Sequence, residues 1–246
     1  GQGTAKRLRI NSAQPKIVEN QQGLLIGFVI EGSEINGNPV TSSLLADFGD
    51  IAPNASGVAR WIMTCSLSGR FVEFKADYTH SDELGGELTS LLEDPVTHFL
   101  VRDVLVDLPG RDRIRDFLAI DGAGAYTVYE SEKIDTPVFN QSGSSSLSGS
   151  GTQYTLTTPV TAGFMVVKLS DPNGGQKTIK EVIRSDGKRI NPENAWLAKT
   201  RVGSQPWQHF FYLFDANTTG SYTVNFGELA VAHVPVLEFV PDRTGV

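Results

Sequence analysis

The chain has 246 residues, of which 39% are hydrophobic and 20% are charged, and its formal net charge is −7. This length allows one large domain or two ordinary domains, and no apolar stretch is long enough to predict a transmembrane segment. The acidic balance disfavours a nucleic-acid partner, because phosphate binding requires a basic field.

Short alternating or apolar stretches, separated by turn-forming residues, run through the whole chain. In the N-terminal half they include residues 24–31, 58–66 and 70–80. Asn36-Gly37 is a favoured dipeptide for a tight hairpin turn. The chain also contains 25 Gly and only 2 Met. Together these features predict an all-β protein with many turns.

Two loops of the N-terminal half are rich in carboxylates. The first contains Asp82, Glu83 and Glu87, and the second contains Asp107, Asp112 and Asp116. Calcium takes about six to eight oxygen ligands, commonly from clustered carboxylates, so these six residues are candidate calcium ligands. Arg111, Arg113 and Arg115 interleave with the second set and could neutralise it. The alternative is a pair of solvated charged loops that hold no metal and no other cofactor.

A Ser/Gly-rich segment at residues 141–151, QSGSSSLSGSG, predicts a flexible loop or linker, because such a composition cannot bury a core. The charge balance changes in the same region. Residues 1–136 carry 12 Lys and Arg against 20 Asp and Glu, whereas residues 137–246 carry 9 against 8. We therefore expect an acidic domain at 1–136 and a second domain at 137–246. Both are expected to be antiparallel β-sandwiches, immunoglobulin-like or jelly-roll-like, in tandem.

The second predicted domain contains two tryptophans that are candidate carbohydrate-binding residues. Trp196 lies in NPENAWLAK, and Trp207 follows Pro206. Exposed aromatic rings can stack on sugar rings, so a pair of carbohydrate-binding modules is one hypothesis. It requires both rings to be exposed and roughly coplanar on one face. The alternative is that both tryptophans belong to the core.

Residues 207–226, WQHFFYLFDANTTGSYTVNF, predict a strand, a tight turn and a second strand. The first strand is apolar on both faces, which is typical of a central strand buried between two layers. The order of Asp215, Gly220 and Tyr222 resembles the tyrosine corner of immunoglobulin-like sandwiches, in which a Tyr hydroxyl bonds backwards to the turn. Tyr222 and Asp215 are therefore candidate structural residues. An ordinary hairpin is the alternative.

The C-terminal tail is apolar, with Pro235 in its middle. Leaving several large aliphatic side chains in water costs about 1.5–3 kcal/mol each. We therefore expect residues 229–234 to pack as a strand on the second domain. Residues 236–240 are then expected to lead to the next module or to a neighbouring copy of the protein. The alternative is that the whole tail lies on its own domain.

Sequence motifs for catalysis are absent. The four histidines have no zinc-binding spacing, and no nucleophile elbow, phosphate-binding loop or dinucleotide fingerprint is found. The single cysteine, Cys65, alternates with other apolar residues, which favours a buried hydrophobic role over a catalytic thiol. The sequence therefore predicts that the chain is not an enzyme.

Several long stretches resemble modules of very large secreted bacterial surface proteins. They are ENQQGLLIGFVIEGSEINGNPV, GVARWIMTCSLSGRFVEFKADYTHSDELGG, and RSDGKRINPENAWLAKTR followed by WQHFFYLFDANTTGSYTVNFGE. The tail VPVLEFVPDRT is similar to the junction that opens cadherin-like and immunoglobulin-like repeats in such proteins. The resemblance implies a tandem β-sandwich segment of an extracellular or cell-surface multidomain chain, and it brings no catalytic residues.

From these observations we expect a non-catalytic structural or adhesion module that serves spacing, assembly or surface attachment. Its expected partners are neighbouring domains or copies of the same protein, with a glycan as a further possibility.

Overall fold

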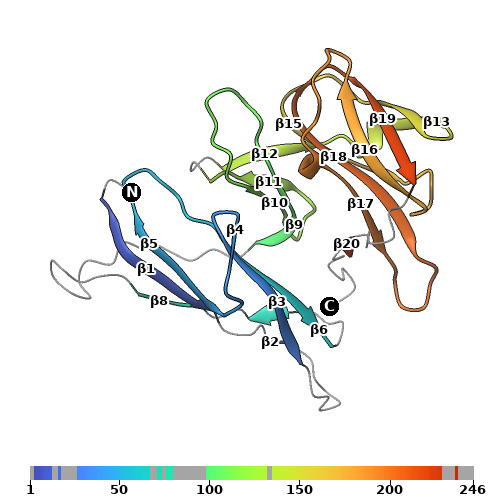
Figure 1. Ribbon diagram of the computed structural model, residues 1–246. Coiled ribbons are helices and arrows are strands. Elements are labelled where there is room, and N and C mark those ends of the chain that lie inside the picture. The colour runs from blue at the N-terminus through green and yellow to red at the C-terminus, as the bar shows by residue number, and fades with distance from the viewer. Residues whose placement is uncertain are drawn as a thin grey trace. The chain divides into compact units, whose positions relative to one another are not determined.

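The computed structural model describes residues 3–12, 16–17, 27–66, 71–73, 76–79, 98–131, 135–228 and 236–237. The described part is all-β, with strands β1 to β20 and two single-turn 3₁₀ helices, η2 and η3 (Figure 1). This confirms the predicted all-β class, whereas the predicted pair of tandem sandwiches stays a prediction. Across these ranges, no helix has the length and apolar character needed to cross a membrane. The chain divides into two compact units, Gly1–Thr97 with Ser131–Lys133, and His98–Glu130 with Ile134–Val246.

The first unit contains three small antiparallel sheets. The first sheet has the order β5 (Leu45–Ile51), β1 (Ala5–Ser12), β8 (Ala76–Thr79). The second sheet has the order β4 (Asn38–Val40), β3 (Phe28–Ile35), β6 (Ala59–Cys65). The third sheet pairs β2 (Lys16–Ile17) with β7 (Phe71–Glu73). Asn36 and Gly37 both have positive φ, 51° and 76°, and join β3 to β4 as a two-residue turn. The predicted hairpin dipeptide is therefore confirmed.

The second unit contains one sheet of eight strands and one of four. The larger sheet has the order β20 (Val236–Leu237), β17 (Ala195–Thr200), β18 (Gln208–Thr218), β15 (Thr161–Ser170), β12 (Asp135–Asn140), β11 (Tyr126–Tyr129), β10 (Asp116–Ile120), β9 (Phe99–Val104). The smaller has the order β13 (Ser146–Ser150), β14 (Gln153–Thr157), β19 (Ser221–Glu228), β16 (Lys177–Arg184). Neighbouring strands are antiparallel, except that β12 pairs with β15 and β17 with β20 in parallel.

Strands β15, β17 and β18 are buried on both faces. Side chains on one face, among them Met165, Leu197 and Phe211, pack against β14, β16 and β19 of the smaller sheet. Alternate side chains on the other face, among them Trp196 and Tyr212, pack against β9 to β12 of the larger sheet. The second unit therefore has three layers, with β15, β17 and β18 in the middle. The two-sided burial predicted from Trp207 onward is confirmed for residues 211–216 of β18, whereas Trp207 and Gln208 are exposed.

The compact units divide the chain elsewhere than the predicted boundary near residue 136. Strands β9 to β11 lie before that boundary, but β12 joins them to β15 by hydrogen bonds on both of its sides. Their apolar side chains also form one cluster with the aromatic face of β17 and β18. The charge balance of the sequence changes near residue 136, but the larger sheet continues across this position.

The Ser/Gly-rich segment is ordered rather than a simple flexible loop. It forms η2 (Ser142–Ser144) and β13, which pairs with β14. Ser142 is held by polar contacts instead of by burial in the core. Its hydroxyl lies 2.6 Å from Asn140 Oδ1 and accepts the Lys168 backbone N–H at 2.8 Å. Of the β13 side chains, Leu147 packs against the core and the others are exposed, so the strand is otherwise held by backbone pairing with β14.

The C-terminal tail differs from the prediction in the part that the structure describes. Residues 229–234 lie outside the described ranges, so the strand expected there stays a prediction. Val236 and Leu237 pair in parallel with Ala198 and Lys199 of β17. Pairing therefore occurs after Pro235, and these two residues lie on their own unit instead of leading away from it.

Candidate functional site

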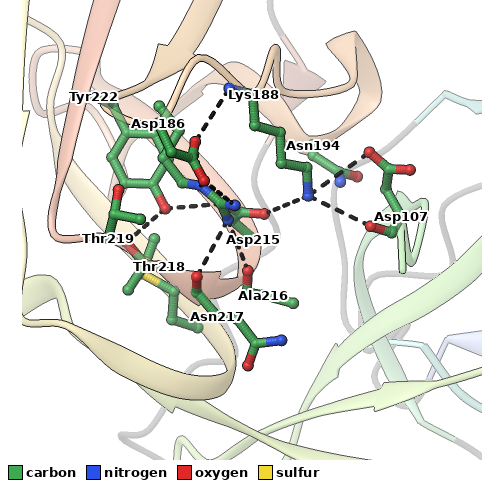
Figure 2. A network of polar contacts seen from close by, with 12 residues as sticks. Asp107, Asp186, Lys188, Asn194, Asp215, Ala216, Asn217, Thr218, Thr219 and Tyr222 are labelled. Carbon is green, nitrogen blue, oxygen red and sulfur yellow. Dashed lines mark hydrogen bonds and ion pairs between the residues drawn. The ribbon is translucent and has the colours of Figure 1, made fainter. Parts of the chain in front are cut away.

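A network of charged and hydroxyl side chains lies where β16, β18 and β19 meet (Figure 2). At its centre is Asp215 of β18, whose side chain is only 2% exposed. Lys188 Nζ lies 3.1 Å from Asp215 Oδ1, and Arg184 Nη1 lies 3.1 Å from Asp215 Oδ2. Each oxygen of this buried carboxylate thus faces a cation, which offsets the cost of removing its charge from water.

Tyr222 connects the network to the turn between β18 and β19. Its hydroxyl lies 2.8 Å from Asp215 Oδ2 and 2.7 Å from Thr218 Oγ1. Thr218 Oγ1 in turn accepts the Gly220 backbone N–H at 3.0 Å. Because a phenol has one proton and the carboxylate can only accept, Tyr222 donates to Asp215 and accepts from Thr218. The hydroxyl therefore reaches back to the turn as in a tyrosine corner, but through side-chain oxygens rather than backbone.

Arg184 links the centre of the network to the surface. Its Nη1 also donates to the carbonyl oxygen of Ala216 at 3.0 Å, and its Nη2 lies 2.7 Å from Asp186 Oδ2. The hydrogen bond from Arg184, with a second from the Lys188 backbone, lowers the pKa of Asp186 to about 2. Burial, followed by the charge of Asp215, raises the pKa of Tyr222 above its ordinary value. Tyr222 is therefore a neutral hydrogen-bond donor throughout the physiological range.

An open depression of about 520 Å³ borders this network. Its lining residues are Asp107, Leu108, Pro109, Arg184, Lys188, Ala216 and Asn217. Figure 2 shows Lys188 extending between Asp215 and Asp107, with Nζ 3.7 Å from Asp107 Oδ2. The cations at the depression are thus held by carboxylates and carbonyls of the protein itself. The arrangement links strands and leaves the central carboxylate no open oxygen for acid–base work.

The structure describes only half of the candidate calcium ligands. Asp82, Glu83 and Glu87 lie outside the described residues. Of the other three, Asp112 Oδ1 accepts the Ile114 backbone N–H and Asp116 Oδ2 accepts that of Val106, both at 2.8 Å, while Asp107 faces Lys188. No group of three acidic, His or Cys side chains within the described ranges is placed to hold a metal ion.

The arginines of the second acidic loop have partners elsewhere in the chain. Arg111 Nε lies 2.9 Å from Glu130 Oε2, and Arg115 Nη2 lies 2.7 Å from Glu193 Oε1. These ion pairs tie the loop to Glu130, the residue after β11, and to η3 (Pro192–Asn194). In the same place, Asn194 accepts the Leu105 backbone N–H and donates to the Leu105 carbonyl, both at 2.8 Å. The loop is thus a structural connection within the second unit.

The two candidate sugar-binding tryptophans have different environments. Trp196 is 5% exposed, and its ring stacks on Tyr212 with the centroids 4.9 Å apart. Trp207 is 40% exposed, next to Lys199 and Arg201. An exposed, coplanar pair of tryptophans is therefore not present. Cys65, predicted to be buried, is a free and only partly buried thiol.

Sequence reasoning selected Asp215 and Tyr222 but missed Arg184 and Lys188. The only local signal was the turn at Ser185, Asp186 and Gly187, which places both cations at the end of one hairpin. Which carboxylate they meet depends on the pairing of distant strands.

No protein-family model, curated protein or solved structure matches the chain.

Proposed function

We propose that the chain is a non-catalytic structural and adhesion module of an extracellular bacterial multidomain protein. In this role it spaces, assembles or attaches the parent protein, with neighbouring domains or further copies as partners. The observation that carries the proposal is the use of its buried carboxylates. The carboxylates of Asp116, Asp171 and Asp215 all accept hydrogen bonds or form ion pairs, and these contacts hold strands and turns in place.

A hydrolase would use such groups differently. A general acid or base needs an oxygen that can reach substrate, and a carboxylate pair needs an open space between its members. Asp171 illustrates the contrast, since its two oxygens accept the backbone N–H groups of Asn173 and Gly175 and close a turn. The surface-protein resemblance of the sequence supports the same function, because it implies modules without catalytic residues.

A turnover screen tests the proposal. The whole chain is incubated with panels of glycans and peptides, and products are followed by mass spectrometry over hours. We expect no turnover above a heat-denatured control. Turnover that one carboxylate substitution abolishes, for example Asp107→Asn in a variant with unchanged thermal unfolding, contradicts the proposal and assigns an enzyme.

Carbohydrate binding is a second candidate function, and one observation favours it. Trp207 is exposed beside two cations, although Trp196 is not available as its partner ring. Because Trp196 is buried, the predicted two-ring platform cannot form. The exposed ring of Trp207 is still available to contact a glycan.

A further inference from the structure

The loop between β17 and β18 gathers two cations around one exposed ring. Lys199 Nζ lies 4.9 Å from the ring centroid of Trp207, and Arg201 Cζ lies 4.6 Å from it. Val202, next along the loop, is 74% exposed. The loop projects beyond the paired part of its two strands (Figure 1). Lys199, Arg201, Val202 and Trp207 are called the hairpin tip below.

Strand register explains why these side chains meet. Thr200 of β17 pairs with Gln208 of β18, so the residues that follow and precede them face each other across the hairpin. Arg201 and Trp207 occupy these positions. The contact therefore depends on the pairing of two core strands and not on the loop alone. This pairing holds the cations near the ring before any ligand binds.

Within the described ranges, the two cations of the hairpin tip have no carboxylate partner. In the part of the chain that the structure describes, neither Lys199 nor Arg201 forms an ion pair with a carboxylate, in contrast to Arg184 and Arg115. The indole ring is neutral, so its contact with the cations leaves their charge in place. Residues 195–214 also contain no Asp or Glu, although the chain as a whole has a net charge of −7.

We propose that the hairpin tip binds an acidic polysaccharide. A sugar ring packs on the exposed part of the Trp207 indole, and a carboxylate or sulfate group on the sugar contacts Lys199 and Arg201. This inference rests on the proposed attachment function and names the partner for it. Because Trp196 is buried, Trp207 is the one ring of the predicted pair that is available for stacking, so the charged group distinguishes this ligand from a neutral sugar.

The composition of the loop favours a polysaccharide over a lipid surface. A segment that inserts into a membrane presents several apolar side chains, and its cations contact the headgroups. Here Val202 is the only aliphatic side chain between Thr200 and Gln208 apart from Pro206, and the centre of the loop is Gly203, Ser204 and Gln205. Hydroxyl and amide groups suit a ligand rich in hydroxyls.

Isothermal titration of the whole chain tests the proposal with three polymers: alginate for carboxylates, dextran sulfate for sulfates, and neutral dextran. We expect binding to at least one acidic polymer, with none to neutral dextran. Lys199→Gln with Arg201→Gln should weaken binding at least about tenfold, since it removes both charge-assisted contacts. Trp207→Ala should weaken it at least about fivefold, since it removes the ring that holds the sugar.

The matched control is Lys180→Gln with Arg189→Gln, which removes the same charge from exposed positions on β16 and the turn after it. This pair should change affinity less than about twofold, because exposed charges far from a ligand are screened by salt. An equal loss in the control pair shows attraction to net charge alone and overturns the site. Failure of both acidic polymers to bind also overturns it. Phosphatidylglycerol vesicles are titrated as a fourth ligand, and binding to them alone overturns the site as well.

The result is separable from the turnover screen. Absence of binding together with absence of turnover removes the hairpin-tip site and leaves the non-catalytic module. Binding that the tip variants weaken, accompanied by cleavage of the polymer, keeps the site and removes the non-catalytic function. Relative affinity for alginate and dextran sulfate identifies the anionic group.

Discussion

At the scale of single residues, Asp215 shows how neighbours determine the role of a carboxylate. A buried charge without partners is strongly destabilising, whereas Asp215 has Lys188, Arg184 and Tyr222 within 3.1 Å. These partners come from β16, the turn after it and β19. The carboxylate therefore joins three parts of the second unit, and its position inside a strand of aromatic residues has a structural reason.

Replacement of Tyr222 by Phe removes the hydroxyl between Asp215 and Thr218. We expect a loss of about 1–3 kcal/mol in the free energy of unfolding, because Asp215 Oδ2 and Thr218 Oγ1 each lose one buried hydrogen bond. Tyr154→Phe is the matched control. Tyr154 is a partly buried tyrosine of the same sandwich that packs edge-on to Phe226. Urea denaturation measures both variants, and equal losses would contradict the role given to the Tyr222 hydroxyl.

Alkaline pH should destabilise the second unit through Tyr222. The folded state holds the pKa of this phenol above its ordinary value, while the unfolded chain releases the proton near pH 10. Above that pH the unfolded state binds fewer protons, so the free energy of unfolding falls as pH rises. The difference between the parent chain and Tyr222→Phe should therefore shrink between about pH 9.5 and 11. A constant difference would show that Tyr222 ionises equally in both states.

At the scale of elements, the middle strands explain the contrast between the two tryptophans. Trp196 lies within β17 on the face that packs against β9 to β12, whereas Trp207 lies just before β18. Trp196→Ala should reduce the free energy of unfolding by about 3–5 kcal/mol, since it opens a cavity in the core. Trp207→Ala should reduce it by only about 1–2 kcal/mol, the size of two exposed cation–π contacts. Thermal and urea unfolding of the two variants decide this, and similar losses would contradict the assigned layers.

Much at this scale could be predicted from local pattern. The alternation in Tyr222, Val224 and Phe226 and the two-sided apolar character of β18 follow directly from side-chain period. The strand β13 in the Ser/Gly-rich segment could not be predicted from its composition, because its support comes from backbone pairing with β14 and from Leu147 alone on the core. The ion pairs of Asp215 also depend on strands far apart in the sequence. The acidic residues of loop 107–116 have structural contacts that no spacing rule indicates.

At the scale of the whole molecule, the second unit combines an expected sandwich with a layer that sequence composition assigned to the other domain. The smaller sheet covers one face of β15, β17 and β18, and β9 to β12 cover the other. Charge changes between residues 136 and 137, yet β12 spans that point and pairs on both sides. A shift in composition is therefore a poor guide where a sheet continues through it.

The central claim is that both outer layers are needed to bury the middle strands, and comparison of two fragments tests it. Urea unfolding of 98–246 should be a single cooperative transition. Fragment 137–246 lacks β9 to β11 and exposes several large side chains, each contributing about 1.5–3 kcal/mol, a sum comparable to the entire stability of a domain. It should show no cooperative transition. Equal midpoints for the two fragments would contradict the three-layered structure and restore a boundary at residue 136.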